Sequence, residues 1–346
     1  MPAAPSSRYS ILFQHGLTGV NRLLLRRRWH VWLDAPHDTS RAMSRGRFFA
    51  FGNVTIDDLV FADGSTLWRI PGGGAIYSAL GMAVWGERPC VIARVGEDYP
   101  VEKLTGRIDL SLCQPIRRTL RYWGLYEEDG TRCFIARAGM LNWLDFCPKP
   151  ADLDDGPYPL CHLAPLPLDL QATLAVALRA RSACLISVDL DGRRLGETPA
   201  SGIARLMAVV DLFMPSRQEV AEIFPGLTPL DGMRALRDLA PETPVIVIKC
   251  GAAGAIAHER GAADYLACPS AAETLVEETG AGDAFCGGAL FGFSRRRSLS
   301  EALAQAAVSA SFALEGVGAS GLVTASLGEA ERRLQRIADR IEQLPF

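Results

Sequence analysis

The sequence contains no uncharged apolar run long enough to form a membrane-spanning helix. Such a helix needs about 18 or more residues, whereas the longest uncharged stretch, 70–86, is interrupted by glycines. None of the nine cysteines forms a Cys-x-x-Cys pair, and only five histidines occur. These absences argue against a membrane protein, a cysteine-ligated zinc site and a histidine-centred metal site. The cysteines are best explained as buried free thiols in a reducing compartment, and we expect a cytoplasmic protein.

Two common nucleotide-binding patterns are also missing. The chain has no Gly-x-x-x-x-Gly-Lys-[Ser/Thr] loop, and Gly52 stands alone after the first expected strand, where a dinucleotide-binding fold would have Gly-x-Gly-x-x-Gly. A nicotinamide-dependent dehydrogenase is therefore disfavoured.

Acidic residues are scarce only at the start of the chain. Residues 1–45 contain seven Arg and two Asp, a net charge of +5, while the whole chain of 346 residues carries −3. We interpret 1–45 as a basic extension: a misassigned start with Met43 as the true initiator, a transit peptide or a genuine, disordered extension. The remaining 301 residues then carry −8, which does not favour nucleic acid as a partner. We expect the functional domain to span 46–346.

Within that domain, short apolar runs alternate with helical patterns, and the composition is that of a soluble globular protein. This alternation predicts an α/β fold, a doubly wound and mostly parallel sheet flanked by helices. The expected strands are 48–54, 90–95, 160–164, 184–189, 211–214 and 244–249. The expected helices are 74–86, 168–181, 201–209, 217–223, 231–239, 282–293, 299–314 and 326–343.

Residues 117–137 differ from this alternation. Two β-rich segments flank Glu128-Asp129-Gly130, which predicts a β-hairpin with an Asp-Gly turn. We interpret this hairpin as a small lid. Its aromatic residues either face the substrate or pack within the hairpin, and its exposed face is a candidate homodimer surface; these residues are Tyr122, Trp123 and Tyr126.

The most informative segment is Thr279-Gly280-Ala281-Gly282-Asp283. Its glycines allow backbone N–H groups to converge at the start of a helix, where an anion is favoured. A carboxylate at Asp283 would repel a phosphate bound there, so its presence calls for a chemical reason. One such reason is that Asp283 accepts the proton of an alcohol that attacks the phosphate. Taken alone, the segment is equally typical of a glycine-rich turn with an acid near the helix start.

The longer segment 277–288 closely resembles the second signature of the PfkB/ribokinase-like carbohydrate kinases. The resemblance implies that the backbone at Gly280, Ala281 and Gly282 forms an anion hole for the transferred phosphoryl group and that Asp283 is the base. It implies ATP and Mg²⁺ as cofactors, with Thr279 on the nucleotide side. It extends over about residues 46–340.

Substrate elements of the same family are matched early in the chain. Segment 52–57 resembles the first strand, whose acid binds sugar hydroxyls, and this acid maps to Asp57, with Asp58 beside it. Segment 71–79 resembles the first signature, which implies that Gly72 and Gly73 approach the substrate. Tyr77 stands where the family has Asn, or Ser78 if the glycine pair is shifted by one residue, so the substrate pocket differs from that of a common sugar kinase.

Nucleotide elements are matched late. Segment 215–219 resembles Pro-Asn-x-x-Glu, with Ser216 in place of the Asn, and implies that Glu219 helps to hold Mg²⁺, in some members through water. Segment 249–254 resembles a loop beside the nucleotide, which assigns Lys249, Gly251 and Gly254 to ATP binding. The resemblance thus implies a divergent kinase that phosphorylates a hydroxyl of a small sugar, polyol or nucleoside. A non-catalytic sugar- or nucleotide-sensing protein on the same fold is the alternative.

Overall fold

The computed structural model describes residues 47–129, 131–137, 142–193, 195–295 and 298–346. Contacts divide the chain between Ser44 and Arg45, and everything below concerns the second unit, Arg45–Phe346. The expected extension 1–45 and the turn residue Gly130 lie outside the described residues.

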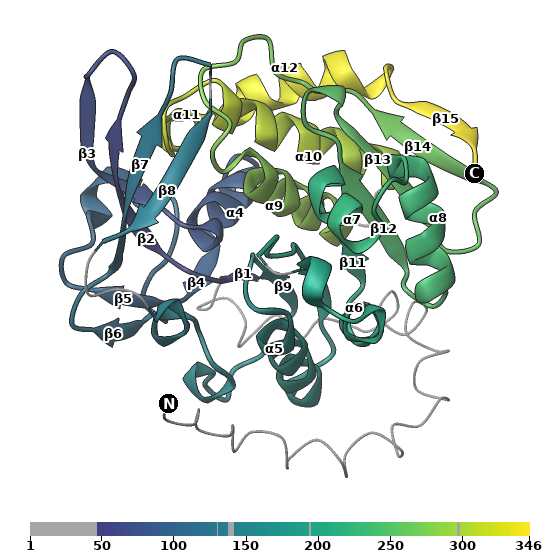
Figure 1. Ribbon diagram of the computed structural model, residues 1–346, viewed down its shortest axis with the longest axis horizontal. Coiled ribbons are helices and arrows are strands. Elements are labelled where there is room, and N and C mark those ends of the chain that lie inside the picture. The colour runs from purple at the N-terminus through teal and green to yellow at the C-terminus, as the bar shows by residue number, and fades with distance from the viewer. Residues whose placement is uncertain (1–46, 130, 138–141, 194, 296–297) are drawn as a thin grey trace, which may run out of the picture. The chain divides into compact units, whose positions relative to one another are not determined.

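The main sheet has nine strands in the order β15-β14-β13-β12-β11-β10-β9-β1-β4 (Figure 1). From β4 to β12 every neighbouring pair is parallel, and from β12 to β15 every pair is antiparallel. The parallel strands are β1 (Phe48–Phe51), β4 (Cys90–Ile92), β9 (Leu160–Leu163), β10 (Leu185–Val188), β11 (Leu212–Phe213) and β12 (Val245–Lys249). The antiparallel strands are β13 (Ala255–Glu259), β14 (Asp264–Cys268) and β15 (Glu342–Pro345).

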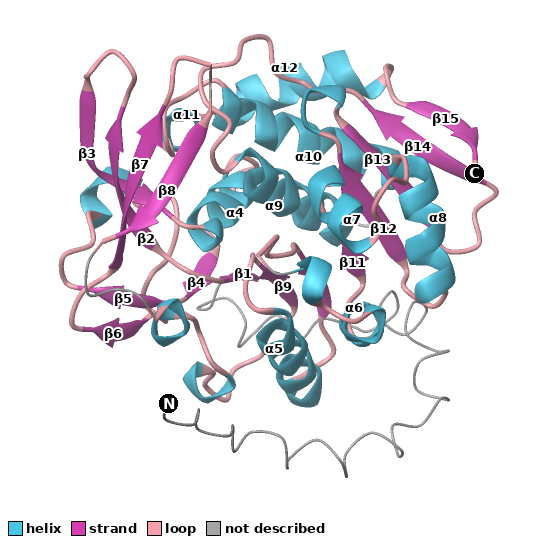
Figure 2. Cartoon of the chain, in the orientation of Figure 1, coloured by secondary structure: helices cyan, strands magenta, loops and turns pink. Residues whose placement is uncertain are grey.

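Helices cover both faces of this sheet (Figure 2). One layer consists of α4 (Gly74–Ala83), α9 (Ala281–Ser294), α10 (Leu299–Leu314), α11 (Ser320–Thr324) and α12 (Leu327–Ala338). The other layer contains α5 (Leu168–Arg181), α6 (Ala200–Met207), α7 (Arg217–Ile223) and α8 (Pro229–Leu239). The parallel strands are therefore buried on both faces, which explains why they consist of continuous apolar runs.

The expected α/β architecture is confirmed, and α5, α7 and α10 begin and end at the predicted residues. The predicted capping box before α10 also forms, with Ser298 and Glu301 exchanging hydrogen bonds of 3.2 Å. The long helix expected over 326–343 is wrong at its end, because α12 stops at Ala338 and the chain continues as β15. The antiparallel strands β13–β15 were not predicted, since their mixed polar and apolar residues follow no clear period.

The first predicted strand, 48–54, is shorter than expected. It ends at Phe51, and at Gly52 the backbone lies so close to Ala164 and Ala75 that a Cβ would contact both methyl groups. The chain then starts a second sheet at Thr55, so Asp57 lies within a strand of that sheet and not at the end of the first strand.

This second sheet has four strands in the order β3-β2-β7-β8, and we call it the lid sheet. The predicted hairpin forms one half of this sheet, and its strands are β7 (Leu120–Tyr126) and β8 (Arg132–Ala136). The assignment of the lid to 117–137 alone is too small, because β2 (Thr55–Val60) and β3 (Thr66–Gly72) form an antiparallel pair that joins β7 through a parallel β2–β7 ladder. A separate two-stranded sheet consists of β5 (Arg94–Gly96) and β6 (Gln114–Ile116).

No helix among the described residues is both long enough and apolar enough to cross a membrane. Seven of the nine cysteines are buried, as expected for small apolar side chains, and none of the nine forms a disulfide within the described part of the chain.

Candidate active site

The site lies where α9 begins, beside the carboxyl ends of the parallel strands. Gly280 is the N-cap of α9 with φ +78°, a left-handed conformation that favours glycine. A Cβ on Gly280 would collide with the ring of Tyr77 from α4. Two constraints therefore favour glycine at position 280: the left-handed backbone angle and the ring of Tyr77 packed against it.

Asp283 lies in the first turn of α9, as predicted. Its Oδ1 is enclosed and has no hydrogen-bond partner within the described part of the chain. The start of α4 approaches it so closely that a Cβ on Gly74 would lie 2.7 Å from this oxygen. Burial raises the pKa of Asp283, and the negative charges of Asp189 and Glu219 raise it further. The positive charge of Lys249 opposes them, and the resulting pKa is about 7. A carboxyl group with this pKa suits proton transfer near neutral pH.

Lys249 lies at the end of β12, and its amino group forms a buried ion pair with Asp189, which follows β10. The Lys249 amino group is also 3.7 Å from Cys286 Sγ and within 3.4 Å of where a Cβ on Gly282 would be. Burial would lower the pKa of Lys249, but Asp189, Cys286 and Glu219 outweigh it and raise this pKa. The structure thus places one positive charge next to the start of α9.

Sequence reasoning missed Asp189. The available signal was its position as the last residue of the predicted strand 184–189, since the carboxyl ends of parallel strands are where α/β sheets bind ligands.

The amides of the anion hole are not equivalent. The Ala281 N–H donates to the Glu278 carbonyl at 3.3 Å, so it is engaged within the loop itself. Gly282 and Asp283 occupy the first helical turn, where N–H groups have no partner within the helix. Of the three amides implied by the resemblance, that of Ala281 is therefore the least available to an anion.

Glu219 lies in the first turn of α7 and forms a capping box with Ser216. The Ser216 N–H donates to Glu219 Oε2 at 2.6 Å, and the Glu219 N–H donates to Ser216 Oγ at 3.2 Å. Burial and the nearby Asp189 carboxylate raise the pKa of Glu219 to about 7. The backbone N–H of Ser216 thus holds Oε2, and the capping box does not use Oε1. Among the described residues, no three acidic, histidine or cysteine side chains gather as a metal site.

On the lid sheet, the two adjacent acids point to opposite faces. Asp57 is paired across the β2–β7 ladder with Tyr122, and burial raises its pKa to about 7, with smaller contributions from Glu277 and Asp58 and an opposing hydrogen bond from Thr55. Asp57 Oδ1 is enclosed without a partner in the described residues. Its role as the substrate-binding acid stays a prediction.

Asp58, in contrast, is fully engaged on the other face. It accepts from Arg121 at 2.7 Å, from Arg137 at 3.2 Å and from the Arg69 N–H at 3.0 Å. Although its burial opposes this, these partners lower the pKa of Asp58. The ambiguity between the two acids in the sequence is resolved by the pleat of β2.

The glycines and Tyr77 expected near the substrate do lie around Asp57. A Cβ on Gly72 would collide with the Asp57 carboxylate, and Gly73 has φ +99° with the Asn53 carbonyl against its Cα. Tyr77 is buried, and burial raises its pKa, followed by the charges of Asp57 and Glu277. Ser78, the alternative position, instead donates to the Gly74 carbonyl within α4.

The aromatic residues expected on the inner face of the hairpin divide between its faces. Tyr122 shares the face of Asp57, and Tyr126 reaches the loop before α9 through hydrogen bonds to Glu277. The expectation that Trp123 lies on the inner face is wrong. Its ring packs edge-to-face on Trp68, 5.6 Å away, on the opposite side of the sheet.

The remaining predicted nucleotide residues lie at two places. Thr279 Oγ1 is 3.3 Å from the Tyr126 hydroxyl, at the loop that leads into α9. Gly251 and Gly254 flank a short turn after β12, and a Cβ on Gly254 would collide with the Cys268 carbonyl of β14. The close approach of β14 is therefore a structural reason for a glycine at 254.

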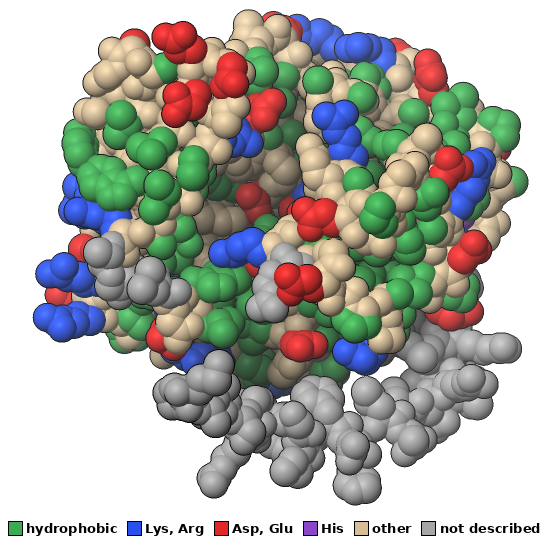
Figure 3. Space-filling model, viewed as in Figure 1, with side chains coloured by type: hydrophobic (Ala, Val, Ile, Leu, Met, Phe, Trp, Pro, Cys, Tyr) green, Lys and Arg blue, Asp and Glu red, His purple; other side chains and the backbone are tan. Residues whose placement is uncertain are grey.

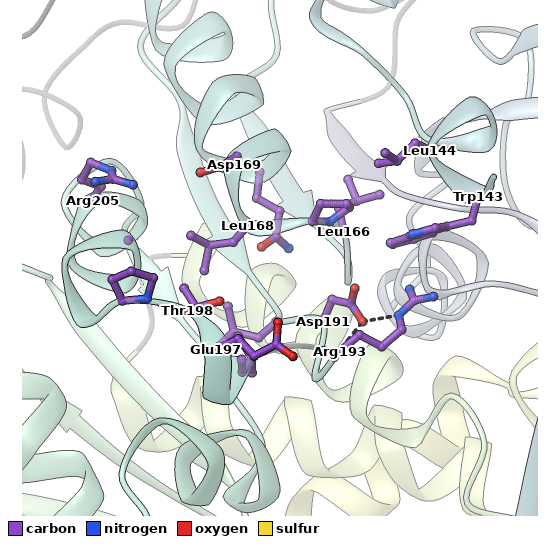
Figure 4. A pocket seen from close by; sticks show the side chains of 16 residues that line it. Trp143, Leu144, Leu166, Leu168, Asp169, Asp191, Arg193, Glu197, Thr198 and Arg205 are labelled. Carbon is purple, nitrogen blue, oxygen red and sulfur yellow. Dashed lines mark hydrogen bonds and ion pairs between the residues drawn. The ribbon is translucent and has the colours of Figure 1, made fainter. Parts of the chain in front are cut away.

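A hollow with acidic side chains at its floor separates the lid sheet from the rest of the described unit (Figure 3). Beside the carboxyl ends of β9 and β10 lies a cavity of about 520 Å³ whose wall includes Trp143, Leu166, Asp191 and Arg193 (Figure 4). The Arg193 guanidinium stacks 3.8 Å over the Trp143 ring, pairs with Asp191 at 2.8 Å and hydrogen-bonds Tyr122 of the lid sheet. Arg193 thus stands between the cavity and the side of the site that contains Asp57.

Comparisons with known proteins agree with this arrangement. Residues 156–325 match the family described as pfkB family carbohydrate kinase. A cytidine kinase of Thermococcus kodakarensis is 28% identical over 256 residues, which cover 72% of this chain and 89% of that protein.

Solved structures show the same fold. A nucleoside kinase of Methanocaldococcus jannaschii, described as an archaeal member of the ribokinase family, superposes with a TM-score of 0.67 at 16% identity, covering 84% of this chain and 99% of that one. A putative ribokinase II of E. coli, solved with ATP and Mg²⁺, superposes with a TM-score of 0.69 at 18% identity, covering 84% and 100%. The chain thus has the ribokinase fold, and it resembles the pfkB family carbohydrate kinases over residues 156–325.

Proposed function

We propose that this protein transfers the γ-phosphoryl group of ATP to a hydroxyl of a nucleoside. The observation that carries the proposal is Asp283, an enclosed carboxyl group with a pKa of about 7 at the start of α9, next to unpaired helix N–H groups. An acid beside an anion site is costly unless it acts on the group that attacks the anion.

In the proposed reaction, Asp57 accepts hydrogen bonds from substrate hydroxyls and orients the acceptor. Asp283 takes the proton of the attacking hydroxyl as its oxygen bonds to the γ-phosphorus and the bond to ADP breaks. The free N–H groups of the first turn of α9 and the positive charge of Lys249 stabilise the transferring group. Such positioning and electrostatic stabilisation are the main contributions of a protein to phosphoryl transfer.

The residues present fit Mg²⁺ that arrives with ATP. Mg²⁺ is commonly held by one or two carboxylates together with substrate phosphates and water, and Glu219 offers one carboxylate with Oε1 unused by the capping box. The raised pKa of Glu219 is consistent with this role, because a nearby cation would favour its charged form. When bound, the ion would neutralise charge on the phosphates.

Three observations favour a nucleoside over a free sugar. The cytidine kinase is similar over most of its own length. The cavity beside Arg193 and Trp143 provides an apolar and aromatic wall next to the Asp57 side of the site, as a flat heterocyclic base requires. Tyr77, where the family has an amide side chain, also changes the pocket from one suited to a common sugar.

The homodimer stays a prediction. The outward face of the lid sheet exposes Trp68 and Ile135, which are 51% and 49% accessible, and exposed apolar patches of this kind are typical of protein interfaces.

A substrate panel tests the proposed function. Purified protein with Mg²⁺ and ATP should release ADP fastest with a nucleoside, and at a lower rate with free ribose, hexoses, inositols or linear polyols. A higher rate with a free sugar would overturn the nucleoside assignment. If compounds bind but none stimulates ADP release, the protein is the non-catalytic sensing alternative.

The two adjacent acids of β2 should separate function from stability. Asp57→Asn should lower kcat/KM for the acceptor by about 10²-fold without lowering the Tm, because Asp57 is a buried carboxyl group with a raised pKa. Asp58→Asn should lower the Tm, because removing a partner of charged hydrogen bonds costs about 1–3 kcal/mol. Thermal melts and acceptor kinetics on both variants measure this, and equal losses of kcat/KM would contradict the assignment of Asp57.

A further inference from the structure

One hydroxyl of the lid sheet reaches the loop that leads into α9. The Tyr126 hydroxyl, on β7, donates to Glu277 Oε1 and is 3.3 Å from Thr279 Oγ1. Glu277 is only 6% exposed, and its other oxygen, Oε2, accepts the Gly318 N–H at 2.6 Å. A single buried carboxylate therefore joins three segments: the lid sheet, the loop before α9 and the turn after α10.

Other contacts support the same junction. A Cβ on Gly318 would collide with Ile70, so β3 of the lid sheet also packs on this turn. At the rim, Arg132 of β8 forms an ion pair of 3.6 Å with Glu278, and both side chains are accessible to water. The exposed pair contributes little, whereas the buried Tyr126–Glu277 hydrogen bond is of the charge-assisted, stronger kind.

Glu277 lies just before the start of α9 in the sequence. Three residues later comes Gly280, the N-cap of α9, where the anion-binding N–H groups begin. Burial, and then the hydrogen bond to Glu277, raise the pKa of Tyr126, so its hydroxyl stays protonated and a donor across any ordinary assay pH.

We propose that Tyr126 is a positioning residue that holds the anion-binding loop 277–280 in place only while the lid sheet lies over the site. It touches neither substrate nor ATP; it acts through Glu277 and Thr279. The contact would link lid placement to completion of the phosphoryl site, so that transfer is favoured when water is excluded. This inference rests on the proposed kinase function.

The length of the Glu277 side chain is part of the inference. Its two oxygens have partners on different segments, Tyr126 and Gly318. An aspartate is one methylene shorter and would have to give up one of them. Glu277→Asp should therefore reproduce the effect of losing the Tyr126 hydroxyl.

The test compares Tyr126→Phe with Tyr265→Phe, which removes a hydroxyl from β14, a strand outside the site. We expect Tyr126→Phe to lower kcat by about tenfold, the loss for a hydrogen bond to a charged group, with a smaller change in the acceptor KM. Its ratio of ATP hydrolysis to phosphoryl transfer should rise, and peptides covering 277–281, whose Glu277 and Ala281 amides are hydrogen-bonded, should exchange amide hydrogen faster. Tyr265→Phe should leave all four quantities at wild-type values.

A purely structural role for Tyr126 would lower the Tm without changing the ratio of hydrolysis to transfer. Combining Tyr126→Phe with Glu277→Gln should produce much less than the sum of the two single effects, because both remove one interaction. Wild-type kinetics and wild-type exchange in Tyr126→Phe would overturn the inference. If the wild type transfers no phosphoryl group to any acceptor, the proposed function fails instead, while the exchange experiment still decides whether Tyr126 holds the loop.

Discussion

Replacing Asp283 with asparagine is expected to lower kcat by about 10²–10⁴-fold, the usual contribution of a positioned general base. Asparagine has nearly the same shape but cannot accept the hydroxyl proton. Steady-state ADP release with the best acceptor measures the loss. A kcat near that of the wild type would contradict the role of Asp283.

The wild-type pH profile provides a second check of the same residue. Asp283 must be ionised to act as a base, and its pKa is raised to about 7. Activity should therefore rise with pH through about 7 and level off above it. An acid limb near the ordinary aspartate pKa of about 4 would mean that the environment of Asp283 differs from the one described.

Stability should change in the opposite direction from activity. Because the folded-state pKa of Asp283 lies above its unfolded value, its stabilising contribution is fully present below about pH 4 and is lost as the pH rises through about 7. Asp283→Asn has no charge to bury, so its stability relative to the wild type should increase as the pH rises from 5 to 8. The increase should be at least about 1 kcal/mol, or about 2–4 °C in Tm. Melts of the unliganded proteins at both pH values compare them directly.

The second large effect is expected from Lys249→Met. The substitution leaves the Asp189 carboxylate buried without its cation, and breaking a buried ion pair in this way costs about 3–5 kcal/mol. Lys249 also lowers the pKa of Asp283, so its removal should shift the acid limb of the activity profile to higher pH. Denaturant unfolding and a pH–rate profile measure the two effects.

The matched control for this prediction is the double variant Lys249→Met with Asp189→Asn. It removes both charges of the pair, so it should recover part of the stability that the single variant loses. Unchanged stability in Lys249→Met would show that the pair contributes nothing, and an unshifted acid limb would separate Lys249 from Asp283.

Local patterns predicted part of the site well. Asp283 and Gly280 lie at the predicted junction between a loop and a helix, which could be recognised because it is built from consecutive residues. The buried parallel strands were also recognisable, because a strand covered on both faces must be apolar along its whole length. The antiparallel edge and the β2–β3 half of the lid sheet were not recognisable, since polar and apolar residues are mixed along them and show no continuous apolar run.

Other features of the site depend on contacts between residues that are distant in the sequence. The sequence could not distinguish Asp57 from Asp58, because only the strand pairing shows which acid faces Tyr122 and which faces Arg121. Lys249 appeared as a nucleotide-binding residue, yet its amino group is paired with Asp189, 60 positions away. The chain lacks a phosphate-binding P-loop, and the tertiary structure instead brings the amino group of Lys249 next to the start of α9, where we propose that the anion binds.

By itself, the sequence determined the fold class, the glycine-rich start of α9 and the acid in its first turn, because each of these is a property of neighbouring residues. The tertiary structure alone decided which acid of β2 is held by arginines, how burial and neighbouring charges raise the pKa of Asp283, and that Tyr126 reaches Glu277 from 151 positions away. The reason is physical: burial and pairing set the energy of a charged group, and both are determined by residues that the fold brings together.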